Sequence, residues 1–188
     1  MSDFAPCVAF TLREEGGFVD NPDDPGNATN LGITLATLSH WRGHSCTVDD
    51  VRALTQAEAS AIYRADYWTP LMADSVASGL DLMLFDFGVN TGCGASTRML
   101  QRIIGVTQDG EMGPETLHAA VGSLAVIRSR IASLGSLQEQ YYRDLPTFDE
   151  FGSGWIARTQ RRQSAAMALT IHVPPIAEPS TDNVGASS

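Results

Sequence analysis

Apolar residues near the start of the chain recur at the spacing of a helix. From residue 4 to residue 12 they lie three or four positions apart, so they share one face of an α-helix. Ser2 or Asp3 can cap the first turn, and Gly16-Gly17 ends the pattern. We therefore predict a first helix that stops at these glycines.

Residues 18–34 have a different composition. The segment is dense in Asp, Asn, Pro, Gly and Thr, and it has few apolar residues before Leu31-Gly32-Ile33. Such residues favour turns, because they tolerate or stabilise backbone conformations that helices and long strands do not use. The pattern predicts a loop followed by a short β-hairpin, outside the core.

The pattern after the hairpin is helical. Thr55-Gln56-Ala57-Glu58 is a capping-box sequence and predicts a helix that continues to about Trp68. Residues 80–87 are apolar on nearly every side, which is typical of a helix that others surround, so we place this helix at the centre of the fold. Further helices are predicted after Gly92-Cys93-Gly94, from Pro114, over residues 124–143 and over residues 155–171.

These elements predict an α+β fold that is mostly helical, with one short hairpin after the first helix. A chain of 188 residues has room for one full-sized domain but not for two large ones. We expect residues 1–172 to form a single domain, with residues 1–75 and 76–172 as its two lobes. Residues 173–188 are rich in Pro, Ser and small residues, and we expect a disordered tail there.

The composition excludes several classes of protein. Hydrophobic residues make up 43% of the chain, and no apolar run approaches the ~20 residues of a membrane span, so we expect no membrane insertion. The formal net charge of −10 argues against a nucleic-acid partner. The one local exception is a basic cluster near the end of the last predicted helix, Arg158, Arg161 and Arg162.

Neither the cysteines nor the histidines predict a metal site or a cofactor. Cys7, Cys46 and Cys93 are odd in number and far apart, which fits neither a disulfide framework nor paired zinc ligands. We expect free, buried thiols. His40 and His44 share a helical face, but no third ligand lies nearby in the sequence.

Adjacent glutamates, Glu14 and Glu15, lie at the end of the first predicted helix. At about 100° per residue, Glu15 falls about 20° from Phe4 on the apolar stripe, and Glu14 falls about 80° away. Burial and the negative end of the helix dipole both disfavour a charged carboxylate, so Glu15 is the candidate general acid. The alternative is that Glu15 only binds the loop that follows.

A second carboxylate is expected from the acidic loop of residues 20–26. Asp24 follows Glu15 by nine positions, and a chain that doubles back through a hairpin brings it opposite Glu15, where it can act as a base or position a water molecule. Asp20 is the alternative base. A solvated turn explains the same residues, because Asp-Pro-Gly is a common turn sequence.

Several short motifs, in order and at compatible spacings, resemble glycoside hydrolase family 108, the Glu-Gly-Gly-Tyr muramidases. The resemblance covers about residues 5 to 165. Phe18 replaces the motif tyrosine, and Asn27 replaces a glycine. The motifs are Glu15-Gly16-Gly17-Phe18, Asp24-Pro25-Gly26, residues 29–34, Tyr67-Trp68, residues 84–92 and residues 109–116.

This resemblance implies a lysozyme-like fold and hydrolysis of the bond between N-acetylmuramic acid and N-acetylglucosamine. It implies that Glu15 is the general acid, and that Asp24 with Thr29 or Asn30 positions water. The second half of the chain also resembles what is called a predicted peptidoglycan-binding domain. We do not expect a separate domain there, because the helix of residues 80–87 needs cover from both halves.

Candidate substrate-binding residues are Phe18, Thr34, Trp68 and Asn90. Trp68 and Trp155 are both candidates for the floor of a sugar subsite, and core packing is the favoured alternative for each. A structural role with Asp86 is the favoured alternative for Asn90.

The predicted function is that of an N-acetylmuramidase, as in a phage endolysin or a related bacterial enzyme, with peptidoglycan glycan strands as partner. Met1 to Phe4 carry no secretory signal, so we expect synthesis in the bacterial cytoplasm and action on the wall after holin-type or other release. We expect a monomer. The alternatives are a lytic transglycosylase on the same bond and a non-catalytic peptidoglycan-binding or secretion-assisting protein.

Overall fold

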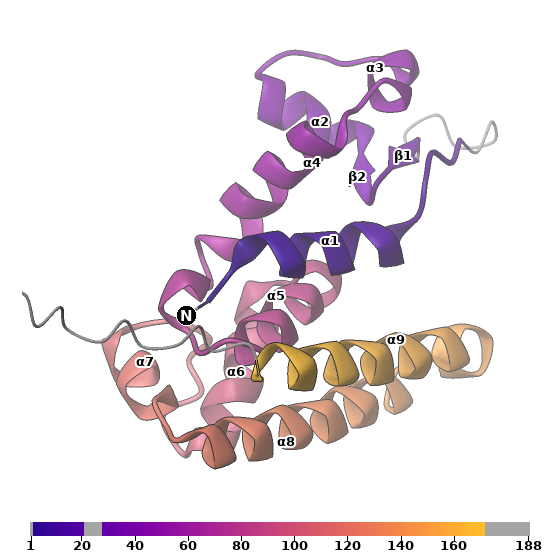
Figure 1. Ribbon diagram of the computed structural model, residues 1–188. Coiled ribbons are helices and arrows are strands. Elements are labelled where there is room, and N and C mark those ends of the chain that lie inside the picture. Colours follow the sequence, from indigo (N-terminus) through magenta and orange to yellow (C-terminus); the bar gives the residue numbers. More distant parts are fainter. Residues whose placement is uncertain (1, 21–27, 172–188) are drawn as a thin grey trace, which may run out of the picture.

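The computed structural model describes residues 2–20 and 28–171. The predicted fold class is confirmed: the described chain is mostly helical, with a two-stranded antiparallel hairpin after the first helix (Figure 1). The elements are α1 (Phe4–Glu15), β1 (Thr29–Asn30), β2 (Ile33–Thr34), α2 (Leu35–Arg42), α3 (Val48–Arg52), α4 (Gln56–Tyr63), η1 (Arg64–Trp68), η2 (Ala73–Ser75), α5 (Leu80–Thr91), α6 (Cys93–Ile104), α7 (Pro114–Ala120), α8 (Leu124–Arg143) and α9 (Phe148–Leu169).

Helix α1 begins and ends where the sequence predicts. The Asp3 carboxylate accepts a hydrogen bond from the Ala5 amide at 3.0 Å, so Asp3 is the cap. Gly16 has a φ of +78°, a conformation that favours glycine, and the helix ends there. This geometry leaves Glu15 as the last helical residue.

The hairpin is short and tightly defined. Thr29 pairs with Thr34 and Asn30 with Ile33, so only Leu31 and Gly32 form the turn. Both turn residues have positive φ, 53° and 76°, which is the type I′ geometry that two-residue hairpins prefer. Leu is unusual in this conformation, because its Cβ crowds the backbone.

Helix α5 is the centre of the fold, as predicted. Every residue from 80 to 88 is buried, and the helix packs against α1, α6, α8 and α9. Figure 1 shows α1 crossing the middle of the molecule, with α2 to α4 and the hairpin on one side and α5 to α9 on the other. One continuous apolar core includes side chains from both sides, from Cys7 and Phe10 in α1 to Leu134 in α8.

One of the predicted helix boundaries is wrong. Helix α9 begins at Phe148, seven residues before the predicted start at Trp155. Gly152 and Gly154 lower helix propensity by about 1 kcal/mol each relative to Ala. Aromatic packing overcomes this cost, because Trp155 stacks on Tyr142 of α8. The helix that starts at Gln56 ends at Trp68 as predicted, with π geometry over Arg64–Trp68.

The predicted capping box at Thr55 is only half formed. Thr55 accepts a hydrogen bond from the Glu58 amide, but the Glu58 carboxylate accepts hydrogen bonds from Nε and Nη2 of Arg42, at 2.9 and 2.8 Å. A complete capping box occurs instead at Thr47 and Asp50, where α3 begins.

The three cysteines are free, with Cys7 buried and Cys46 and Cys93 half-buried. Among the described residues, no helix is both long enough and apolar enough to cross a membrane. The predicted disordered tail of residues 173–188 and the candidate base Asp24 lie outside the described residues.

Asp81 is a buried carboxylate beneath the start of α5. Its Oδ1 atom accepts hydrogen bonds from the Gly79 and Leu82 amides, both at 2.7 Å, whereas Oδ2 has no partner in the described chain. Burial, only partly offset by these bonds, raises the pKa of Asp81 to about 6. A raised pKa means that the folded state binds a proton more tightly than the unfolded state.

Replacing Asp81 with Asn should therefore stabilise the protein at neutral pH. The penalty for the ionised group is absent below the unfolded pKa of about 4 and fully present above pH 6, where it amounts to about 3 kcal/mol. Asn keeps the acceptor at Oδ1. We expect urea unfolding to show a larger gain at pH 8 than at pH 4; an equal gain at both would contradict the assignment.

Candidate active site

Glu15 lies at the end of α1, beside its neighbour Glu14, and the two side chains point to different parts of the protein. The Glu15 side chain is 19% exposed and the Glu14 side chain 8% exposed. The prediction that Glu15 is the more buried of the two is therefore wrong. The buried stripe of α1 includes Phe10 and Thr11, so its centre lies between the two glutamates, and α9 covers Glu14.

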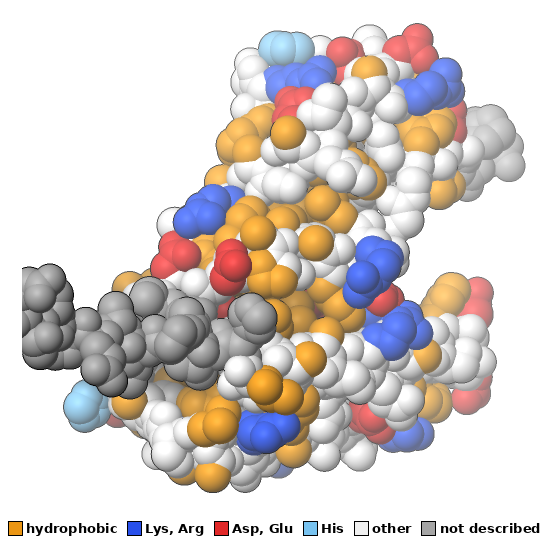
Figure 2. All heavy atoms as spheres, in the orientation of Figure 1, with side chains coloured by type: hydrophobic (Ala, Val, Ile, Leu, Met, Phe, Trp, Pro, Cys, Tyr) orange, Lys and Arg blue, Asp and Glu red, His pale blue; other side chains and the backbone are white. Residues whose placement is uncertain are grey.

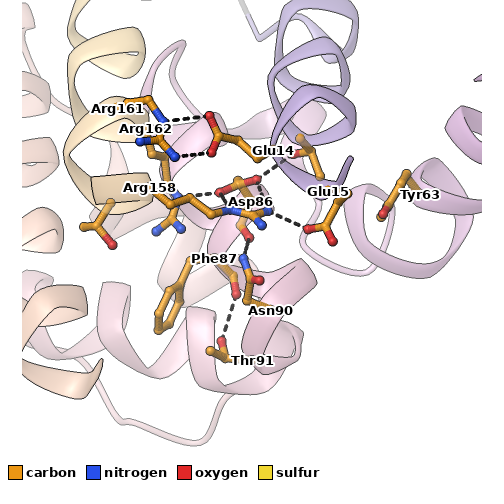
Figure 3. A network of polar contacts seen from close by, with 12 residues as sticks. Glu14, Glu15, Tyr63, Asp86, Phe87, Asn90, Thr91, Arg158, Arg161 and Arg162 are labelled. Atoms are coloured by element: carbon orange, nitrogen blue, oxygen red, sulfur yellow. Dashed lines mark hydrogen bonds and ion pairs between the residues drawn. The ribbon is translucent and has the colours of Figure 1, made fainter. Parts of the chain in front are cut away.

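Three arginines of α9 each bind a carboxylate (Figure 3). Arg158 donates to Glu15 Oε1 at 2.7 Å. Arg161 donates to both oxygens of Glu14, at 2.9 and 2.6 Å, and these hydrogen bonds hold the pKa of Glu14 below its ordinary value. The basic cluster of the sequence is thus neutralised within the protein.

Asp86 is at the centre of this network. It is fully buried in α5 and accepts hydrogen bonds from Thr11 at 2.8 Å, from Arg158 at 2.7 and 3.1 Å and from Arg162 at 2.7 Å. Burial alone would raise the pKa of Asp86, but the two guanidinium groups together outweigh it and hold the pKa below its ordinary value. Arg158 therefore joins Asp86 to Glu15 (Figure 3).

The hairpin turn and α4 cover the opposite side of Glu15. The Tyr63 hydroxyl donates to the Leu31 carbonyl at 2.9 Å, which fixes the turn on α4. A Cβ at Gly32 would overlap the Tyr63 hydroxyl and would lie 2.9 Å from Glu15 Oε2. Burial first, and then the neighbouring Glu15 charge, raise the pKa of Tyr63, so its hydroxyl remains a donor.

The two carboxyl oxygens of Glu15 therefore have different surroundings. Arg158 binds Oε1, and Oε2 faces the bare backbone of Gly32. A residue with a side chain at position 32 would fill the space next to Oε2.

The other predicted residues of the hairpin have structural contacts. Asn30 is 8% exposed, and its amide donates to the carbonyls of Val51 and Arg52. Thr34 caps α2 by accepting a hydrogen bond from the Thr37 amide at 3.1 Å. These contacts give Asn30 and Thr34 structural roles in the hairpin and at the start of α2. Thr29 is half-buried in β1 and keeps its candidate role.

Trp68 is a core residue, which removes it from the candidate substrate-binding residues. It is 0% exposed, and its indole nitrogen donates to Asp74 at 2.9 Å. Phe18 is half-buried, and the Arg52 guanidinium lies over its ring at 4.7 Å, so one stacking face is already covered. Asn90 is exposed on α5 and donates to the Asp86 carbonyl.

The acidic loop is anchored at both ends. Val19 and Thr29 form an antiparallel bridge with backbone hydrogen bonds of 2.8 and 2.9 Å. Asp20 follows this bridge directly and is exposed. The choice between Asp24 and Asp20 as second carboxylate stays a prediction.

In the ranges 2–20 and 28–171, no three His, Cys, Asp or Glu side chains form a group that could hold a metal ion. The residue that the sequence did not assign to the site is Arg158. Its cluster was noticed as an exception to the acidic composition, but nothing in the pattern indicated which carboxylates it binds.

Glu15, which Arg158 orients at the end of α1 beside the hairpin, is a carboxyl group of the kind that glycosidases use for proton transfer at a glycosidic bond. The comparisons with known proteins agree. The sequence profile of the family Glycosyl hydrolase 108 matches residues 8–92. The solved structure of Brucella abortus SagA is 39% identical in sequence, with a TM-score of 0.77 over 89% of this chain and 95% of that chain. No curated protein matches the chain.

The chain belongs to glycosyl hydrolase family 108, and its class of activity is that of a glycoside hydrolase. The matched residues 8–92 include Glu15 and Asp86 but not Arg158, which lies in the second half of the chain.

Replacing Asp86 with Asn should destabilise the protein by about 3 to 5 kcal/mol, because it leaves two buried guanidinium groups without their shared carboxylate. The low pKa of Asp86 in the folded state means that its stabilisation is present above the unfolded pKa and is lost as pH falls through the folded pKa. We expect urea unfolding to show a steep loss of stability below pH 4 in the parent protein and a shallower loss in Asp86→Asn. Equal acid dependence of the two proteins would argue against this role.

Replacing Gly32 with Ala should reduce activity strongly. The methyl group overlaps Tyr63 and crowds Glu15 Oε2, and the positive φ adds about 1 to 2 kcal/mol of strain. The check is the rate of glycoside hydrolysis, measured together with urea unfolding. Gly43→Ala is the matched control, because Gly43 has a similar φ of +72° with open space around it. If both variants lose the same stability and neither loses activity, Gly32 does not shape the site.

Proposed function

We propose that this protein is an N-acetylmuramidase, which hydrolyses the bond between N-acetylmuramic acid and N-acetylglucosamine in peptidoglycan. The observation that carries the proposal is the place of Glu15, at the end of α1 between Arg158 and the Gly32 turn. Membership of glycosyl hydrolase family 108 supports the class of reaction. The proposed substrate is the glycan strand of the bacterial wall, reached after release from the cytoplasm.

Glu15 protonates the oxygen of the leaving sugar. For this step the carboxyl group must first bind a proton and then present it to the glycosidic oxygen. Arg158 holds Oε1, so Oε2 is the atom that carries the proton toward substrate. The glycine at position 32 leaves space beside Oε2 for the sugar, and Asp86 keeps Arg158 in place.

The second carboxylate comes from the loop between Val19 and Thr29. The bridge between these two residues anchors the loop to the hairpin, and the hairpin turn contacts Glu15. Asp24, or Asp20 in its place, then activates the water that completes hydrolysis. A lytic transglycosylase would use Glu15 without this water.

Replacing Glu15 with Gln should reduce lysis by at least about 100-fold, because the amide keeps the shape but has no proton to transfer. The measurement is loss of turbidity of outer-membrane-permeabilised bacterial cells. Glu14→Gln is the matched control: it is adjacent, equally conservative and bound to Arg161 rather than Arg158, so it should retain most of the activity. Full lysis by folded Glu15→Gln protein would refute the proposed acid.

The lysis assay and two further measurements separate the remaining alternatives. Asp24→Asn should lose more activity than Asp20→Asn; the reverse order would make Asp20 the base. Mass spectrometry of the released fragments distinguishes hydrolysis, which adds water, from transglycosylation, which leaves anhydro ends. Protein that sediments with peptidoglycan but releases no fragments would indicate a binding function instead.

A further inference from the structure

An unusual row of side chains leads away from Glu15 along α9. Phe151, Trp155 and Arg158 are four and three residues apart, so they share one face of the helix. Arg158 contacts Glu15, and the row extends from it for about 10 Å toward the start of the helix, at 1.5 Å per residue. It is therefore continuous with the proposed active site.

The aromatic rings of this row pack against other aromatic rings of the protein. Trp155 stacks on Tyr142 of α8, with ring centres 5.3 Å apart and planes at 24°. Tyr142 is 4% exposed and packs edge-on against the buried ring of Phe87. Phe151 lies 5.7 Å from Trp155 at a tilted angle. The rings are thus preorganised, which lowers the entropy cost of binding a ligand.

The aromatic rings of the row are also partly exposed to solvent. Phe151 is 48% exposed and Trp155 is half-buried. Gly154, on the same side of α9, has open space where a Cβ would be. In Figure 1 the first turns of α9 continue past the end of α1, and in Figure 2 the surface is hollowed between this end of the molecule and the hairpin side.

We propose that Phe151 and Trp155 are the floor of a sugar-binding subsite that holds the glycan strand on the α9 side of Glu15. This inference rests on the proposed function. Pyranose rings present apolar C–H faces that pack on aromatic rings, while their hydroxyl groups remain in water. A protein with a net charge of −10 gains no general attraction to an anionic wall, so uncharged contacts of this kind supply the affinity.

The kinetic test uses Phe151→Ala, Trp155→Ala and the ring-retaining Trp155→Phe on purified peptidoglycan. Each alanine variant should raise KM about three- to tenfold with little change in kcat, because the rings contact sugar away from the reacting bond. Trp155→Phe should have a KM close to that of the parent protein, because the variant keeps an aromatic ring. Trp41→Ala is the control, since Trp41 is 41% exposed on α2, away from the site. Unfolding curves identify any variant that is only destabilised.

A binding test does not depend on turnover. In Glu15→Gln protein, N-acetylglucosamine oligomers should change the tryptophan fluorescence, and the change should persist with Trp41→Phe but disappear with Trp155→Phe. Unchanged KM in both alanine variants, or a signal that survives Trp155→Phe, would overturn the subsite. If Glu15→Gln itself remains active, the proposed function fails instead, so the two failures are distinguishable.

Discussion

The buried carboxylate of Asp86 is the constraint on which the rest of the site depends. An ionised group with no exposure to water requires compensation from within the protein. Arg158 and Arg162 supply it from α9, and Thr11 adds a hydrogen bond from α1. Satisfying this one group therefore fixes three helices relative to each other, and places Arg158 where it also reaches Glu15.

This arrangement makes the two halves of the chain one functional unit. The family profile matches residues 8–92, where the proposed catalytic glutamate and the hairpin lie. The arginine that orients the glutamate and the aromatic row proposed to hold sugar both come from α9, at residues 148–169. The second half thus supplies the charge that complements α1 and, in our proposal, part of the substrate site.

The arginines near Glu15 are paired with carboxylates inside the protein. Three of its arginines are used in internal pairs with Glu14, Glu15 and Asp86. They add almost nothing to the surface as free positive charge, so in our proposal the glycan strand is recognised by shape and by apolar contact. In our proposal, the exposed ring of Phe151 and the half-buried ring of Trp155 meet that requirement on the α9 side of Glu15.

The sequence by itself determined the main elements, and it selected Glu15 as the candidate acid. Helix α1 with its glycine stop, the hairpin at Leu31-Gly32 and the surrounded helix α5 all follow from local patterns, because periodicity and turn residues act over a few neighbouring positions. Glu15 was identified from its position in such a pattern. Only the tertiary structure decided that Glu14 is the more covered glutamate, that Trp68 is core, that Asn30 and Thr34 hold the backbone and that Arg158 binds Glu15 across 143 positions. These outcomes depend on which helices pack together, and a buried charge such as Asp86 takes its partners from helices far apart in the sequence, which no local pattern records.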